Sequence, residues 1–169
     1  VWMSFRIRVF VSFDVDLDLR YYRLMKSWSQ IDNTAFNFHD AHDLFYARDT
    51  SLESSIKSRL GQRLASAKVF ILLIGTSTRY LFKFVRWEIE QALRLKLPII
   101  AVNLNKTRHF DSAFCPPLLR NELVMHVSFN SRIIQHALET WPLKHRSLAA
   151  TGARGPYYYE DTTYARFGL

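Results

Sequence analysis

The sequence predicts a doubly wound α/β domain, in which helices cover both faces of a mainly parallel, five-stranded sheet. Residues 69–74 are apolar at every position, and residues 99–104 are apolar at nearly every position. Such runs are typical of strands that are buried on both faces, as in a parallel sheet. Segments with the 3.6-residue period of amphipathic helices alternate with the strand segments, which is the order expected of a doubly wound fold.

The expected strands and helices can be placed one after another along the chain. Residues 6–13 form the first strand, and the helix that follows carries Asp14, Asp16 and Asp18 at its start, where acidic residues complement the helix dipole. The later elements, in order, are a strand at 35–38, a helix from 50 or 51 to about 67, the strand at 69–74, a helix at 82–96, the strand at 99–104, a strand at 123–127 and a helix at 131–140. Right-handed crossovers then bring the carboxyl ends of the strands to one edge of the sheet.

Residues 1–143 are expected to form one domain, and residues 144–169 a C-terminal tail. The tail contains three of the five glycines and has no helical or strand period. It also carries five aromatic side chains, which are unusual in a disordered segment. We therefore expect the tail to be either disordered or docked on a partner.

Composition narrows the class of protein. Cys115 is the single cysteine, which excludes an internal disulfide and a cysteine-rich zinc site and fits the reducing cytoplasm. No apolar stretch approaches the roughly 18 residues needed to cross a bilayer, so we expect no membrane span. The net charge of +8 favours anionic partners, but the lysines and arginines form no run of five or more, and nucleic acid is therefore not expected as a partner.

Several side chains that can bind or react are expected at the edge of the sheet where the strands end, which is the edge that holds ligands in open α/β sheets. In the helix at 82–96, Glu88 projects roughly 80° from the apolar face, beside Phe84 one turn earlier, whereas Glu90 points toward water. Glu88 is therefore the candidate catalytic carboxylate. The candidate binding residues are Ser12, Phe13, Asp14, Asp40, Asp43, Thr76, Ser77 and Phe84.

A metal site is a further interpretation of the loop that contains His39, Asp40, His42 and Asp43. No cluster elsewhere in the sequence completes a ligand set, so we expect no metal there. Loop polarity and contact with the hydroxyls of a substrate ribose are the two other interpretations of these side chains.

The chain resembles a TIR domain, and most closely the bacterial TIR-like group of Thoeris anti-phage systems. The resemblance covers residues 6–140. Its carriers are Arg8-Val9-Phe10-Val11-Ser12-Phe13, the end of the second strand with Phe38 and Asp40, Leu72-Leu73-Ile74-Gly75-Thr76-Ser77-Thr78 and, most specifically, Phe84-Val85-Arg86-Trp87-Glu88-Ile89, which is similar to the family's Trp-x-x-x-Glu-Ile motif. Phe84 stands where the family usually has tryptophan, so packing can be kept but an indole hydrogen bond cannot.

The resemblance implies a flavodoxin-like sheet and an enzyme that takes NAD⁺ as a substrate, with no bound cofactor, and cleaves the bond between nicotinamide and ribose. It assigns the catalytic role to Glu88. Loss of neutral nicotinamide leaves positive charge on the sugar, and a fixed carboxylate stabilises that charge, as in glycoside hydrolysis. Phe13 and Phe84 would flank the nicotinamide, and Thr76 and Ser77 would hold phosphate. Capture of the sugar by an internal nucleophile would then give a cyclic ADP-ribose-type signal.

The resemblance also implies partners. These are other copies of the chain, which associate through TIR surfaces, a phage protein as trigger, and an effector reached through a diffusible nucleotide. A non-catalytic TIR scaffold that acts by homotypic or partner assembly is the alternative. A phosphorylated receiver domain is excluded, because it needs an aspartate at the end of the third strand, where this chain has Ile74, Gly75 and Thr76.

Overall fold

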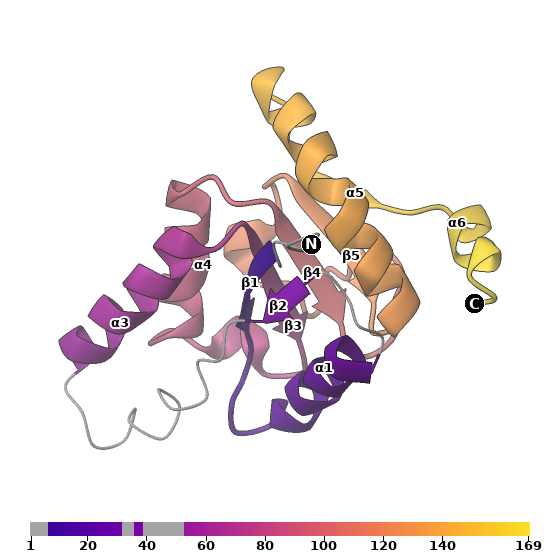
Figure 1. Ribbon diagram of the computed structural model, residues 1–169. Helices are drawn as coiled ribbons and strands as arrows, with labels where there is room; N and C mark the ends of the chain where they lie inside the picture. Colours follow the sequence, from indigo (N-terminus) through magenta and orange to yellow (C-terminus); the bar gives the residue numbers. More distant parts are fainter. Residues whose placement is uncertain (1–6, 32–35, 39–52) are drawn as a thin grey trace, which may run out of the picture.

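The computed structural model describes residues 7–31, 36–38 and 53–169, which form an α/β structure (Figure 1). The strands are β1 (Ile7–Ser12), β2 (Phe36–Phe38), β3 (Val69–Ile74), β4 (Ile99–Asn103), β5 (Val124–Ser128) and β6 (Pro156–Tyr158). The helices are α1 (Leu19–Ile31), α3 (Glu53–Ser66), α4 (Val85–Arg94), α5 (Ser131–Ala150) and α6 (Asp161–Arg166), with short 3₁₀ helices η1 (Thr78–Tyr80) and η2 (Pro117–Leu119).

The strands form one sheet in the order β2-β1-β3-β4-β5-β6, and every neighbouring pair in it is parallel. The expected five-stranded parallel sheet is thus confirmed in β1 to β5, and β6 adds a sixth strand at the edge. The chain runs from β1 outward to β2 and then returns to β3 on the other side of β1. This reversal is the switch point at which doubly wound sheets bind ligands.

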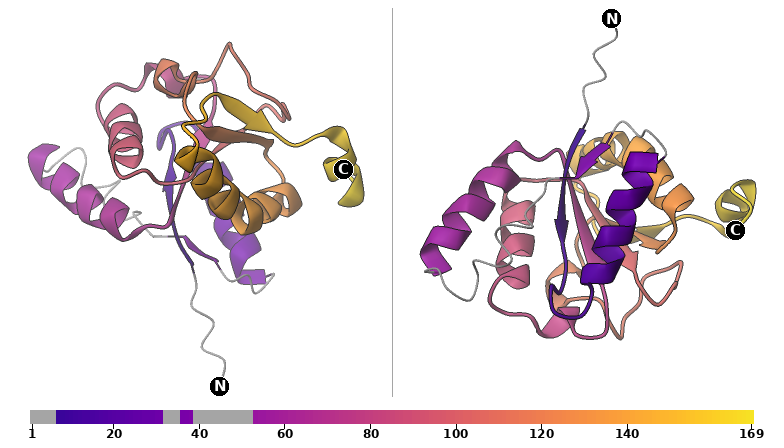
Figure 2. Two further views of the ribbon diagram at one scale, coloured as in Figure 1. Left: turned by 90° about the horizontal axis from the view of Figure 1, so that it is seen from above. Right: turned by 60° about the horizontal axis from the view of Figure 1, so that its bottom comes forward.

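Helices cover both faces of the sheet, as the sequence predicts (Figure 2). One face packs under α1 and α5, and the other under α3 and α4. Because side chains alternate along a strand, Val9 and Val11 of β1 face the first pair of helices and Phe10 faces the second pair. Position 12 therefore belongs to the face that packs against α4.

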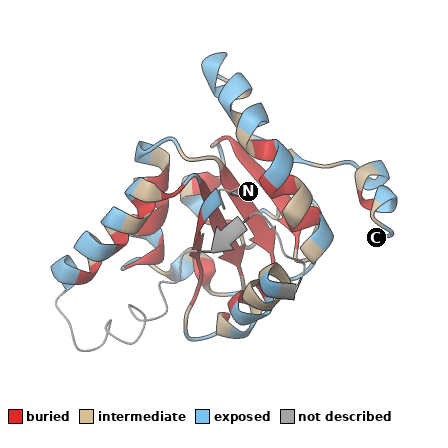
Figure 3. Cartoon of the chain, in the orientation of Figure 1, coloured by how far each residue is buried: buried red, intermediate tan, exposed pale blue. Residues whose placement is uncertain are grey.

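The centre of the sheet is buried, and its strand β3 is fully apolar. All six residues of β3 are buried, as are all residues of β4 and β5 (Figure 3). The predicted run at 69–74 coincides with β3, which pairs with β1 on one side and β4 on the other. A strand with helices on both faces needs this composition, because neither face reaches water.

The C-terminal part differs from the expectation of a disordered or partner-docked tail. Helix α5 does not end near residue 140 but continues through Pro142 to Ala150, and residues 156–158 then pair with β5 as a sixth strand. The aromatic side chains of the tail pack on the chain itself: Tyr157 lies 5.6 Å from the ring of Trp141, and Tyr164 is fully buried. Contacts distant in sequence thus order a segment that has no strong local pattern.

The start of the first helix also differs from the expectation. Helix α1 begins at Leu19, and its first turn contains no acidic residue. Asp14, Asp16 and Asp18 belong instead to the loop that leads from β1 into the helix. Of the three, Asp14 folds this loop, because its carboxylate accepts hydrogen bonds from the amides of Asp16 and Leu17.

Candidate functional site

The carboxyl ends of β1 and β3 meet at one edge of the sheet, since Ser12 pairs with Leu72 in the parallel ladder. The chain leaves β3 through Gly75 and the short helix η1 and enters α4 at Val85. The first turn of α4 thus follows directly on the loop at this edge. Three segments, the end of β1, the turn after β3 and the start of α4, supply the site.

Glu88 is buried and held by Ser12. The two residues are 2% and 1% exposed, and the Ser12 hydroxyl (Oγ) donates a hydrogen bond to Oε2 of Glu88. Strand alternation turns Ser12 toward α4, and Glu88 lies in the first turn of that helix, where its amide donates to the Phe84 carbonyl at 2.8 Å. The sequence predicted that Glu88 lies to one side of the apolar face of its helix. In the structure, that side of the helix faces the end of β1, where Ser12 lies.

Asp14 ties the loop after β1 to the turn after β3. Its Oδ1 accepts from the amides of Asp16 at 2.9 Å and Leu17 at 3.4 Å, which folds the loop back on itself. Its Oδ2 accepts from the Ser77 hydroxyl at 2.5 Å. Asp14 is 5% exposed, so these bonds replace the water that a carboxylate would otherwise hold.

A second carboxylate, Asp18, lies against Gly75. A Cβ atom at Gly75 would come within 2.4 Å of Asp18 Oδ2, so glycine allows this approach. Asp18 is 6% exposed, and its Oδ2 has no hydrogen-bond partner among the described residues. Burial, with a further contribution from the charge of Asp14, raises the pKa of Asp18 from 3.8 to about 6.

The carboxylates of Asp14 and Asp18 lie beside Thr76 and Ser77, where the sequence predicted a phosphate site. The Ser77 hydroxyl donates to Asp14, Thr76 is exposed, and helix η1 after them has three residues. Negative charge from Asp14 and Asp18 beside this turn disfavours a phosphate group. The turn is thus built as a link between strands, and its amides are not arranged at the start of a long helix.

A cavity of about 310 Å³ opens at this edge, beside the Ser12–Glu88 pair. Phe13, Asp14 and Phe84 line it, so three of the predicted binding residues lie at one cavity. Its volume is at the lower end of the range of roughly 300–1,000 Å³ for ligand sites. Ser12 directly precedes Phe13, and Glu88 lies one turn after Phe84, so each member of the buried pair is close along the chain to a lining residue. The other lining residues are Val15, Asp16, Tyr80, Leu81, Phe82, Lys83 and Val85.

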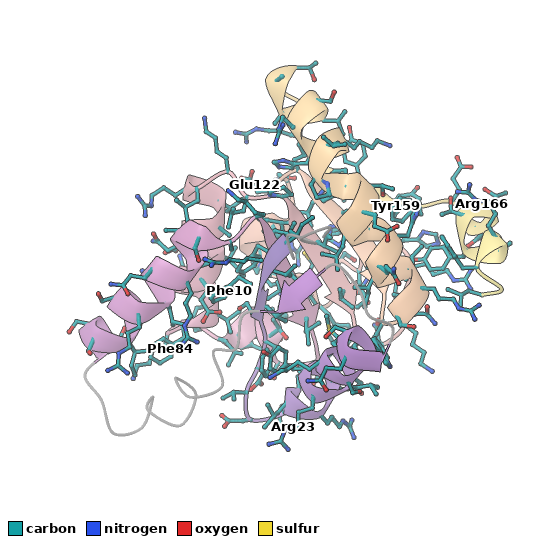
Figure 4. All side chains as sticks on the ribbon, viewed as in Figure 1. Phe10, Arg23, Phe84, Glu122, Tyr159 and Arg166 are labelled. Atoms are coloured by element: carbon teal, nitrogen blue, oxygen red, sulfur yellow. The ribbon has the colours of Figure 1, made fainter. Side chains whose placement is uncertain are left out.

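The two aromatic rings are placed differently from one another. Phe13 is 2% exposed and stacks on Tyr22 of α1, with ring centroids 4.8 Å apart. Phe84 is 8% exposed and packs with the residues under α3 and α4, with the ammonium of Lys83 5.4 Å from its ring centroid (Figure 4). Each ring therefore anchors one wall of the cavity on a different half of the core.

Residues 80–83 form much of the cavity wall, although the sequence pattern did not single them out as binding residues. Tyr80 and Phe82 are 62% and 67% exposed, and Lys83 is the cation among the lining residues. Adjacent large apolar side chains between a strand and a helix were the available signal. Asp40 and Asp43 lie outside the described residues.

The described residues also bear on metal binding, on membrane crossing and on the reactivity of the single thiol. No group of three or more potential metal ligands occurs among them, and no helix of theirs combines the length and the apolar character needed to cross a bilayer. Cys115 is buried, and burial raises the pKa of its thiol to about 11. This thiol is therefore protonated and inert at neutral pH.

Comparison with known families agrees with the geometry. The family model of the Thoeris protein ThsB, TIR-like domain, matches residues 10–109, a span that runs from β1 past the end of β4 and includes Ser12, Asp14 and Glu88. A comparison with curated proteins gives no match. The matched span covers more than half of the chain and all the described residues of the candidate site, and the chain therefore belongs to the ThsB family of TIR-like domains.

Proposed function

We propose that this TIR protein cleaves NAD⁺ at the bond between nicotinamide and ribose and makes a cyclic ADP-ribose-type or related ADP-ribose nucleotide. In this proposal the nucleotide activates an effector protein during anti-phage defence in the cytoplasm. The observation that carries the proposal is the Ser12–Glu88 pair, a buried carboxylate fixed by a hydroxyl beside a cavity at the switch point of the sheet. Membership of the ThsB family supports the same substrate.

The residues of this chain suit a reaction that develops positive charge. When the bond from the ribose C1′ to the nicotinamide nitrogen breaks, its electron pair leaves with the nicotinamide, and C1′ becomes cationic. The carboxylate of Glu88 would stabilise that cation and accept hydrogen bonds from the ribose hydroxyls. Attack of water on C1′ gives ADP-ribose, whereas attack of a nucleophile from the same nucleotide closes a ring.

Access to Glu88 requires a rearrangement. The side chain of Glu88 is 2% exposed and is not among the residues that line the cavity, whereas Phe13 and Phe84 are. Movement of Phe84 with the segment Tyr80–Lys83 would open the carboxylate to the ribose. We infer that association with other copies, or with a trigger such as a phage protein, supplies this movement, because the exposed side chains of Tyr80 and Phe82 offer a contact surface on the same segment.

The test is NAD⁺ consumption by the purified protein over a range of concentrations, with the products resolved by mass spectrometry. Glu88→Gln should lower nicotinamide release by a factor of about 100 or more, because the amide cannot stabilise the sugar cation. The matched control is Glu90→Gln. Glu90 lies on the same helix, 45% exposed, with its carboxylate 3.1 Å from the Arg86 guanidinium, and its substitution should leave the rate unchanged.

Two outcomes oppose the enzyme. Equal activity of the Glu88→Gln and Glu90→Gln proteins would show that Glu88 is not catalytic. Absence of NAD⁺ consumption in the assembled protein, together with full phage defence in cells that carry Glu88→Gln, would leave a TIR scaffold that acts by assembly alone. The nucleotide found by mass spectrometry identifies the reaction in the case of success.

A further inference from the structure

A second groove lies at the opposite edge of the sheet, where the strands begin. It consists of two adjoining cavities, of about 440 and 560 Å³, which share Lys96, His145, Arg146 and Ala149. The smaller cavity reaches the starts of β1 and β3 at Ile7 and residues 68–69, and the larger one reaches the starts of β4 and β5. We call the two together the basic groove.

Exposed cations line the basic groove. Lys68 and Lys96 follow α3 and α4, and Arg146 and Arg154 come from α5 and the segment after it. Within the described part of the chain, none of these four side chains forms an ion pair. Glu122 is the acidic residue among the lining side chains. The groove therefore carries a net positive charge that no ion pair among the described residues neutralises.

The floor of the groove is aliphatic. Leu93, Leu97, Ile99 and Leu123 line the larger cavity together with Ala149, and none of the described residues that line either cavity is phenylalanine, tyrosine or tryptophan. The last two turns of α5 run along the groove, and no residue from 143 to 150 is buried (Figure 3). An extended helix end beside an apolar floor leaves surface that the described residues do not cover.

We propose that the basic groove binds an acidic amphipathic segment of a partner protein. Carboxylates on one side of such a segment would pair with Lys68, Lys96 and Arg146, and its apolar side chains would cover the aliphatic floor. Nucleic acid fits less well, because single strands bind through aromatic side chains on which the bases stack, and the described lining residues of the groove include none. A ligand with charge but no apolar side would leave the aliphatic side chains of the floor exposed to water.

The groove and the candidate active site lie at opposite ends of the strands. Ser12 and Gly75 mark the carboxyl ends, whereas Ile7 and Val69 mark the amino ends. A partner held in the groove thus leaves the opposite edge of the sheet, where the candidate active site lies, uncovered. In Figure 4, Glu122 of the groove lies in the upper half of the view and Phe84 of the candidate active site lies in the lower half. The proposal does not depend on NAD⁺ cleavage.

The test uses the full chain and three probes of equal negative charge: a synthetic Glu/Leu peptide with all its leucines on one helical face, a polyglutamate peptide and a single-stranded oligonucleotide. Fluorescence anisotropy gives the dissociation constants. The amphipathic peptide should bind at least tenfold more tightly than either of the others. Arg146→Glu should weaken its binding at least tenfold, and the matched control Arg23→Glu, an equal charge change on exposed α1, should leave it unchanged.

A substitution in the floor separates docking from simple charge attraction. Ala149→Lys adds a positive charge but places a long polar side chain in the groove, so it should weaken the amphipathic peptide and leave polyglutamate as strong or stronger. Equal binding of all three probes, or equal effects of Arg146→Glu and Arg23→Glu, would overturn the proposal in favour of unspecific polyanion binding. Absence of binding by the amphipathic peptide to a folded wild-type chain would overturn it as well.

Discussion

Asparagine at position 18 should stabilise the protein at neutral pH. The Asp18 carboxylate is 6% exposed, lies against the backbone of Gly75, and leaves Oδ2 without a hydrogen-bond partner among the described residues. Its charge therefore costs free energy in the folded state, and the amide of asparagine carries no such charge. The neutral side chain keeps the same shape in the same space.

The pKa of Asp18 sets the size of this effect. Because the pKa rises from 3.8 to about 6 on folding, the folded protein binds the proton more tightly, and its stability falls as the pH rises between these values. At ~1.36 kcal/mol for each tenfold change, the cost is about 3 kcal/mol at pH 7.5 and about 1 kcal/mol at pH 4.5. Asp18→Asn should therefore gain up to about 3 kcal/mol at pH 7.5 and about a third of that at pH 4.5.

Urea unfolding followed by tryptophan fluorescence at the two pH values measures this gain. Asp16→Asn is the control, because Asp16 belongs to the same loop and is exposed, so the same charge change should alter the free energy of unfolding little. Two results would refute the reasoning: an Asp18→Asn protein no more stable than Asp16→Asn at pH 7.5, or a gain of equal size at both pH values.

Three further substitutions test the packing around the site and the sheet. His126→Leu should gain about 2.5 kcal/mol more at pH 4.5 than at pH 7.5 in urea unfolding, because burial lowers the histidine pKa from 6.5 to about 4 and acid therefore favours the unfolded chain. Tyr164→Phe should cost about 1–3 kcal/mol, since its hydroxyl accepts the buried Ser128 amide at 3.1 Å; an unchanged unfolding midpoint would contradict this. Gly75→Ala should cost about 1–3 kcal/mol by displacing the Asp18 carboxylate, and Asp18→Ala should remove most of that cost in the double variant.

Local sequence pattern predicted the sheet and the catalytic candidate. The uninterrupted apolar run at 69–74 can only be satisfied by burial on both faces, and helical periodicity separated Glu88 from Glu90. The contact between Ser12 and Glu88 joins positions 76 residues apart, and it depends on the packing of α4 on β1, which periodicity alone does not fix.

The C-terminal segment shows why the rest could not be predicted. Pro142 removes a backbone donor from α5, and such a residue usually ends or kinks a helix. Here Trp141 is fully buried and holds that turn against the sheet, so the helix continues past the proline. Strand β6 has three residues and forms by pairing with β5. The hydroxyl of Tyr164 accepts a hydrogen bond from the buried amide of Ser128, which positions this side chain. Each of these contacts is distant in sequence.

Asp18 and His126 are buried titratable groups that act on stability in opposite directions. Between pH 6 and pH 4.5, protonation of Asp18 should add about 1.5 kcal/mol of stability, and suppressed protonation of His126 should remove about 1.7 kcal/mol. Their contributions nearly cancel, so the pH dependence of the wild-type stability shows neither of them. Asp18→Asn should then lose stability over this range, His126→Leu should gain it, and the double variant should match the wild-type slope. Parallel slopes for all four proteins would mean that neither group is buried in a charge-excluding environment.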